Sequence, residues 1–241
     1  MIGQPRTASA HPTGPSPTTV DELVQRARSL ATANGRRILG IVGAPGAGKS
    51  TICAVLTREL GDQSVLVGMD GFHLADDELR RLGRRDRKGA PDTFDVGGYA
   101  ALLERLRGQT SDVVYAPEFD RSLEASIGGA VAVRRDTPLV ITEGNYLLYD
   151  RCGWDAIAGH LDEVWFLDVP ADERRRRLVH RRRSHGDSLD QAEAWVCRVD
   201  EVNAAVVDGT RERADLIVHI DPSPSATDSI PTASADEGAV Q

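Results

Sequence analysis

The feature that most constrains this chain is an octapeptide at residues 43–50, GAPGAGKS, which fits the pattern GxxxxGK[ST]. An apolar run at residues 37–42 precedes it, as expected of a strand buried on both faces, and a helical pattern follows from Lys49. The glycines let successive backbone N–H groups turn inward around an anion, and the start of the helix adds partial positive charge. This order of elements predicts a site for the phosphates of a nucleoside triphosphate, rather than a glycine-rich turn that matches by chance.

The loop also predicts which groups hold the nucleotide. Lys49 is expected to reach the β- and γ-phosphates, and Ser50 to ligate Mg²⁺, so the predicted cofactors are ATP and Mg²⁺. The only other lysine is Lys88, in the sequence RKG, so the guanine-binding motif NKxD of GTPases is absent from the sequence. The predicted nucleotide-binding residues of the loop and first helical turn are Gly43, Ala44, Pro45, Gly46, Ala47, Gly48, Lys49, Ser50 and Thr51.

Strand and helix patterns alternate along the rest of the chain. Strands are expected at residues 37–42, 64–67, 138–142, 164–169 and 214–220, and helices at residues 19–31, 49–60, 99–107, 171–183 and 189–207. Thr19 and Glu22 have the spacing of a capping box at the start of the first helix. Such βαβ units predict an α/β fold with a mostly parallel sheet covered on both faces. In sheets of this kind, ligands bind at the carboxyl ends of the strands.

Composition limits the domain count and the compartment. The segments 1–18 and 222–241 are rich in Pro, Ser and Thr and are predicted to be disordered, which leaves one domain at residues 19–221. A net charge of −8 argues against nucleic acid as the partner, and no apolar stretch reaches the ~20 residues of a membrane span. The 3 cysteines have no CxxC spacing, which is typical of a cytoplasmic protein without a disulfide scaffold or zinc site.

Two carboxylates follow apolar strands. Asp70 comes after the strand at 64–67 and Glu143 after the strand at 138–142. A kinase of small molecules needs a carboxylate at a strand end to accept the proton of a hydroxyl substrate, and a metal-assisting carboxylate at another. The alternative for Asp70 is an acidic residue that caps a turn, and the alternative for Glu143 is an ordinary acidic residue at a strand end.

Several motifs occur in an order that resembles the phosphoribulokinase/uridine kinase superfamily, especially its pantothenate kinase and nucleoside-kinase-like branch. The resemblance covers residues 36–220. Together with the phosphate loop, it rests on MDGFH (69–73), RKGAPDTFD (87–95), VYAPEFDR (114–121), TEGNYLL (142–148), FLDVPADERRRRLVHRRR (166–183) and NAAVVDGTRERADLIV (203–218).

The resemblance implies a three-layer P-loop fold with a helical lid and a hairpin that covers the substrate. It implies that Asp70 is the catalytic base and that Glu143 assists the metal. His73, Tyr115, Arg121 and Asn203 would contact the substrate, with residues 91–95 lining the same pocket. At Pro117 the chain lacks a histidine that pantothenate kinases carry, which argues against pantothenate as the substrate.

An arginine cluster at residues 174–183 matches the lid of this family. Arg174, Arg177 and Arg181 fall at i, i+3 and i+7 and share one helical face, where they could bind ATP and neutralise the phosphoryl group in flight. The alternatives are a solvated basic face or a nucleic-acid patch. Arg175, Arg176, Arg182 and Arg183 are expected to be surface charges.

These observations predict a cytoplasmic kinase that phosphorylates a hydroxyl of a small metabolite, such as a nucleoside, a pantothenate-like alcohol or a sugar. Asp70, Lys49 and Arg177 are its predicted catalytic residues, and a homodimer is compatible with the sequence. Two alternatives remain, a P-loop ATPase and a nucleotide-binding regulatory module without a small-molecule acceptor.

Overall fold

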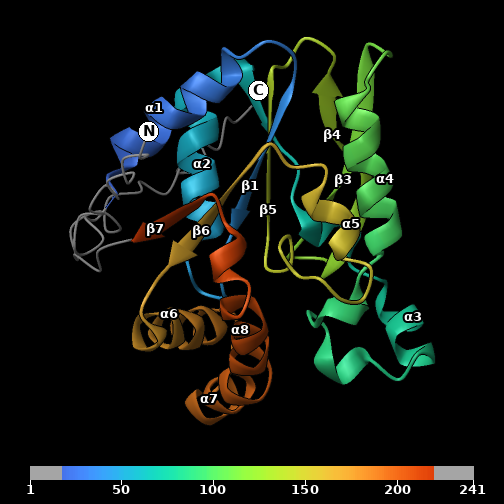
Figure 1. The fold of residues 1–241 in the computed structure, drawn as a ribbon. Helices are drawn as coiled ribbons and strands as arrows, with labels where there is room; N and C mark the ends of the chain where they lie inside the picture. Colours follow the sequence, from blue (N-terminus) through green and yellow to red (C-terminus); the bar gives the residue numbers. More distant parts are fainter. Residues whose placement is uncertain (1–17, 220–241) are drawn as a thin grey trace, which may run out of the picture.

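A five-stranded sheet forms the centre of the molecule, with the strand order β2-β5-β1-β6-β7 and every neighbouring pair parallel (Figure 1). The structure, a computed structural model, describes residues 18–219, so the predicted tails lie outside the described residues apart from Thr18. The five strands are β1 (Arg37–Val42), β2 (Ser64–Leu66), β5 (Leu139–Gly144), β6 (Glu163–Asp168) and β7 (Leu216–His219).

Both faces of this sheet are covered because its strands are apolar on both sides. In β1, Leu39 and Ile41 pack against the helices α1 and α2, whereas Ile38 and Val42 belong to the opposite core, which includes α4 and α8. The result is the predicted three-layer α/β fold with a parallel sheet.

The helices follow the sequence pattern closely. α1 starts after Thr19, whose hydroxyl accepts a hydrogen bond from the backbone of Glu22 while the Glu22 carboxylate caps Thr19 in return, which is the predicted capping box. The helices are α1 (Val20–Ala31), α2 (Lys49–Leu60), α3 (Asp76–Arg81), α4 (Val96–Arg107), α5 (Asp155–Ala158), α6 (Ala171–Ser184), α7 (Leu189–Trp195) and α8 (Glu201–Asp208).

Strands β3 (Val113–Asp120) and β4 (Ala125–Arg134) form a separate antiparallel hairpin beside α4 (Figure 1). Val114, Ala116 and Val133 are buried in the core that α4 shares with the sheet. Residues 114–121, whose motif resembles the family's substrate-covering hairpin, therefore do lie on a hairpin that is attached to the α4 side of the sheet.

Short irregular turns account for the differences from the predicted elements. β2 ends at Leu66, and the 3₁₀ turn η2 (Met69–Phe72) carries Asp70 beyond the strand. The predicted helix 189–207 is divided into α7 and α8 by a π turn (Val196–Asp200), in which Val196 and Val199 are buried. α4 starts three residues before the predicted helix, since the Asp95 side chain caps it by accepting from the Gly98 amide.

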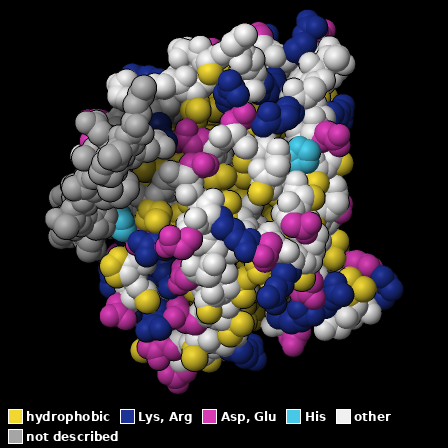
Figure 2. Space-filling view, in the orientation of Figure 1, with side chains coloured by type: hydrophobic (Ala, Val, Ile, Leu, Met, Phe, Trp, Pro, Cys, Tyr) yellow, Lys and Arg dark blue, Asp and Glu magenta, His cyan; other side chains and the backbone are white. Residues whose placement is uncertain are grey.

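Charged side chains of both signs are interspersed on the surface, most densely around α3 and α6–α8 (Figures 1 and 2). In α3, Arg80 pairs with Asp77 and Arg81 with Glu78, as expected of a solvated helix with mixed charge. Within residues 18–219, no helix is both long and apolar enough to cross a membrane.

Candidate functional site

The glycine loop at residues 43–50 connects β1 to α2 at the carboxyl end of the sheet. Gly46 and Gly48 have φ angles of +80° and +89°, and a Cβ atom on Gly46 would lie 2.8 Å from the Arg174 carbonyl oxygen. The loop therefore needs glycine at position 46 both for its backbone conformation and for its contact with α6. Within residues 18–219, no side chain caps the start of α2, so its first amides are available to bind an anion.

Lys49 is held at the centre of the loop by oxygen acceptors. Its ammonium donates to the Gly43 carbonyl at 2.8 Å and to the Asn145 side-chain oxygen at 2.7 Å. Desolvation lowers the pKa of Lys49, while the negative charges of Glu143 and Asp70 oppose that shift. Lys49 thus lies within electrostatic reach of both strand-end carboxylates that the sequence singles out.

Glu143 and Ser50 face each other beside this lysine. The Ser50 hydroxyl donates to the Glu143 carboxylate at 3.4 Å. Desolvation raises the pKa of Glu143, Lys49 lowers it, and the charge of Asp70 raises it further. Mg²⁺ prefers hard oxygen ligands and in such sites takes one or two from the protein and the rest from phosphates and water. A hydroxyl next to a carboxylate fits that requirement, although no cluster of three or more ligating side chains occurs within residues 18–219.

Asp70 lies on η2, and the hairpin packs against this turn. The Arg121 guanidinium is 3.6 Å from one carboxylate oxygen, and His73 Nδ1 is 3.9 Å from the other. Gly71 brings the two segments together, because a Cβ atom there would lie only 2.5 Å from the Pro117 carbonyl oxygen. The structure therefore brings Asp70, His73 and Arg121 together.

His73 is part of an aromatic wall. Its side chain is only 10% exposed, and its ring lies 4.1 Å from Phe94 and 4.8 Å from Phe119, measured between ring centroids. Burial lowers the pKa of His73, and the charge of Asp70 opposes that shift. The ring is thus packed beside Asp70 as an uncharged side chain near neutral pH.

Two expected substrate residues lie elsewhere. Tyr115 is 61% exposed and is flanked on β3 by the buried Val114 and Ala116, so its side chain is on the outer face of the hairpin. Asn203 is buried in α8, where its amide donates to the Gly89 carbonyl at 3.4 Å. Tyr115 is therefore directed away from the core side of the hairpin, and Asn203 is packed against the backbone of the loop that carries Gly89.

The three predicted lid arginines differ in their surroundings. Arg177 donates to the Gly46 carbonyl at 3.5 Å, and the positive charge of Arg181 lowers the pKa of Lys49. Arg174 is buried, donates to the Pro45 carbonyl at 3.4 Å and pairs with Glu201 at 3.5 Å. Arg174 and Arg177 therefore contact the glycine loop and Arg181 lies within electrostatic reach of Lys49, but Arg174 already pairs with an acidic residue of α8.

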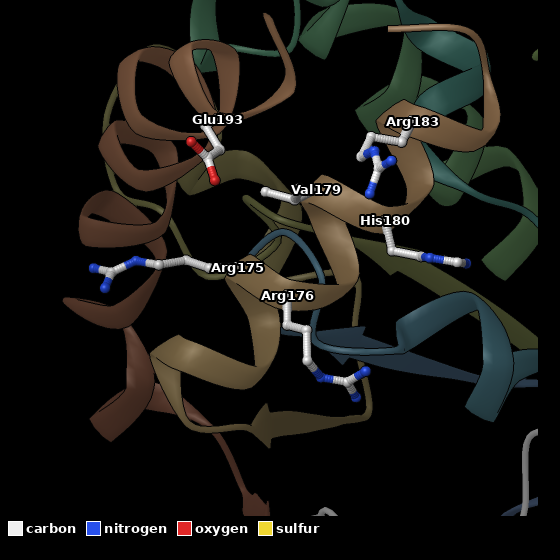
Figure 3. Close-up of a pocket in the computed structure, with 6 residues that line it drawn as sticks. All are labelled: Arg175, Arg176, Val179, His180, Arg183 and Glu193. Atoms are coloured by element: carbon white, nitrogen blue, oxygen red, sulfur yellow. The ribbon is translucent and has the colours of Figure 1, made fainter. Parts of the chain in front are cut away.

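A hollow of about 440 Å³ lies on α6 and α7, away from this site (Figure 3). Two of its arginines are paired, Arg175 with Glu201 and Arg176 with Glu173, as expected of surface charges. Its lining includes none of the residues that lie around the glycine loop or Asp70; it is lined by Arg175, Arg176, Val179, His180, Arg183 and Glu193.

Sequence reasoning missed two polar residues of the site. Asn145 follows Glu143 by two positions and holds Lys49. The side chain of Lys88 is only 10% exposed and donates to Asp76 at 2.9 Å and to the Glu124 carbonyl at 3.0 Å, so it joins the loop before α4 to the hairpin. The sequence does contain one indication that Lys88 is special, because it is one of only two lysines among 29 Lys and Arg residues.

Comparisons with known proteins agree with this architecture. The sequence model of the phosphoribulokinase/uridine kinase family matches residues 38–225. "Putative uridine kinase C227.14" of Schizosaccharomyces pombe is 30% identical over 215 residues, which cover 85% of this chain and 92% of that protein. YggC of Escherichia coli is 34% identical over 205 residues, which cover 82% of this chain and 84% of YggC. The crystal structure of a "putative fructose transport system kinase" from Silicibacter sp. TM1040 has a TM-score of 0.76 at 37% identity and covers 83% of this chain and 98% of that one.

Proposed function

The chain belongs to the phosphoribulokinase/uridine kinase family, and from this premise we propose that it transfers the γ-phosphoryl group of ATP to a hydroxyl of a small metabolite. One observation supports the proposal above the others. At one end of the sheet the charges of Glu143 and Asp70 both act on Lys49, and the Arg121 guanidinium of the hairpin lies 3.6 Å from the Asp70 carboxylate. A site that only bound nucleotide would not need a carboxylate there.

In the proposed reaction, the acceptor hydroxyl oxygen attacks the γ-phosphorus of ATP. The new O–P bond forms as the bond from the γ-phosphorus to the bridging oxygen breaks, which releases ADP, and the hydroxyl proton passes to the Asp70 carboxylate. Lys49 would leave Asn145 to bind the β- and γ-phosphates, and Arg177 and Arg181 would balance the charge of the transferred group.

Mg²⁺, when bound, would supply positive charge that neutralises part of the charge on the phosphates. Ser50 and Glu143 are the residues that would hold it, Glu143 through a water molecule. The loop residues 43–48 and Thr51 would surround the phosphates with backbone amides.

The acceptor belongs to the same proposal. The names of relatives point to hydroxyl compounds of different kinds, a nucleoside in one and a sugar in another. We propose a small polyhydroxy acceptor that enters between Asp70 and the hairpin, with His73 and Arg121 among its contacts. The exposed thiols Cys152 and Cys197 suit a cytoplasmic location, where ATP is available and thiols stay reduced.

An Asp70→Asn variant tests the function. Acceptor-dependent ADP formation should fall by at least about a hundredfold, because the amide cannot accept the proton. ATP affinity, measured by titration with a fluorescent ATP analogue, should change little. ATP turnover in the variant that is independent of any acceptor and equal to wild type would instead support a P-loop ATPase, and no turnover in either form would support a regulatory module.

A further inference from the structure

Arg121 is a cation without a hydrogen-bonding partner at the place where an acceptor would lie. None of the hydrogen bonds formed among residues 18–219 involves its guanidinium, whose nearest acidic neighbour is Asp70 at 3.6 Å. The side chain is 55% exposed, so the guanidinium, with its N–H donors, is accessible to a ligand.

The hairpin tip that carries Arg121 is held in place. The Asp120 carboxylate accepts hydrogen bonds from the Ser122 amide at 2.8 Å and from the Leu123 amide at 3.1 Å, which folds the turn immediately after β3. Lys88 then ties the tip to the neighbouring loop through the Glu124 carbonyl. Arg121 is therefore presented to Asp70 by a built turn and not by a free loop.

The aromatic side chains next to Asp70 are already in contact with other groups. His73 packs against Phe94 and Phe119, and the Lys88 ammonium lies 5.2 Å from the centre of the Phe119 ring. Phe119 is therefore poorly placed to stack a nucleobase. This wall suits a small non-aromatic acceptor better than a nucleoside.

The charges favour an acceptor that is also an anion. With a neutral acceptor, the Arg121 guanidinium would stay beside Asp70 and compete with the substrate hydroxyl for the carboxylate's lone pairs. An anionic oxygen group on the acceptor would bind the guanidinium, often through two parallel hydrogen bonds, and leave Asp70 free for the hydroxyl.

We propose that the acceptor carries an anionic group, a carboxylate or a phosphate ester, in addition to the hydroxyl that is phosphorylated, and that Arg121 binds this group. The inference rests on the proposed kinase function and narrows its substrate class. It makes Arg121 a specificity-determining residue rather than a general contact of the site.

Matched pairs of acceptors test the inference. Wild-type protein is incubated with ATP and Mg²⁺ and with D-gluconate or D-glucitol, with D-fructose 6-phosphate or D-fructose, and with uridine, and phosphorylated products are measured by mass spectrometry. The anionic member of at least one pair should have a kcat/KM at least tenfold above its neutral partner. The two pairs distinguish a carboxylate from a phosphate ester.

Arg121→Gln should remove this preference. The KM of the anionic acceptor should rise at least tenfold, while kcat and the KM of ATP should change by less than threefold and the activity with the neutral partner should not fall. Arg121→Lys, which keeps the charge but not the two-pronged geometry, should restore part of the loss. Arg135→Gln is the control, because Arg135 is an exposed arginine that pairs with Asp112 at the opposite end of the hairpin.

The failures are distinguishable. Phosphorylation of uridine or D-fructose in preference to the anions would overturn this inference and leave the kinase proposal standing, and so would an equal loss with both members of a pair in Arg121→Gln. ATP turnover that no acceptor stimulates and that Asp70→Asn leaves unchanged would overturn both.

Discussion

Gly71 offers a sharp test of how the proposed base, Asp70, is positioned, because the absence of a side chain at position 71 allows the hairpin to approach. In Gly71→Ala the new Cβ atom would lie 2.5 Å from the Pro117 oxygen and 2.8 Å from the Pro117 carbonyl carbon, both rigid backbone atoms. Ordinary contact begins near 3.4 Å, so η2 and β3 must separate by about 0.9 Å. Overpacking of this kind costs about 1–3 kcal/mol of unfolding free energy, which lowers Tm by about 2–12 °C in a domain of this size.

The same displacement acts on the chemistry, since Asp70 immediately precedes Gly71. A misplacement of about 1 Å at a reacting group costs roughly a hundredfold in rate, so kcat/KM for the acceptor should fall by about that factor while ATP affinity is retained. The assay is acceptor-dependent ADP release, with Tm and ATP titration on the same samples. Gly128→Ala is the matched control on the hairpin, because a Cβ atom there meets nothing within 4 Å. A folded Gly71→Ala protein with turnover within threefold of wild type would refute the reasoning.

Three further predictions concern the polar groups around the site. Asn145→Ala should destabilise the protein by about 1.5–3 kcal/mol, because the Lys49 ammonium loses a 2.7 Å hydrogen bond, and ATP should shrink this deficit in thermal unfolding if Lys49 exchanges Asn145 for phosphate. An unchanged deficit with ATP would contradict that exchange. Burial raises the pKa of Asp200 from 3.8 to about 6. The buried carboxylate therefore costs no folding free energy below about pH 4, and its cost grows as the pH rises to 6. Asp200→Asn should raise the free energy of unfolding by up to about 3 kcal/mol at pH 7.5 and by little at pH 4, measured by urea unfolding. Equal effects at both pH values would exclude this origin. Lys88→Met should lower the free energy of unfolding by about 2 kcal/mol or more, because the hairpin tip loses its link to Asp76. The KM of the acceptor should rise, with little change in the KM of ATP. A variant with wild-type KM for the acceptor would show that the position of the tip does not depend on Lys88.

The parallel sheet and the phosphate loop were predictable because each rests on short-range pattern. The run at 37–42 is apolar at nearly every position, and the structure places β1 and α2 at the predicted residues. Thr19 and Glu22 likewise form the predicted capping box, which depends only on a spacing of three residues. Family membership followed from the order of several such motifs.

The acceptor side was harder to predict because it depends on contacts between distant segments. The outward direction of Tyr115 follows from which side of β3 packs on α4, and the link from Lys88 to Glu124 joins residues 36 positions apart. Arg174 shares a helical face with Arg177, as the spacing indicates, yet its burial beside Glu201 depends on how α8 packs against α6, a contact between separate helices. No local pattern in the sequence reports such partners.

The hairpin β3–β4 shares no backbone pairing with the parallel sheet within the described residues, and this separation has an evolutionary consequence. In the proposed function, the phosphoryl donor binds to the sheet and its first loop, whereas the recipient of the phosphoryl group is contacted by a separate two-stranded unit with its own turn. Substitutions at the tip of that unit would then change which recipient is accepted without altering the residues that bind the donor. If the segment equivalent to residues 113–134 is exchanged between two relatives, the preference for a particular recipient should move with that segment.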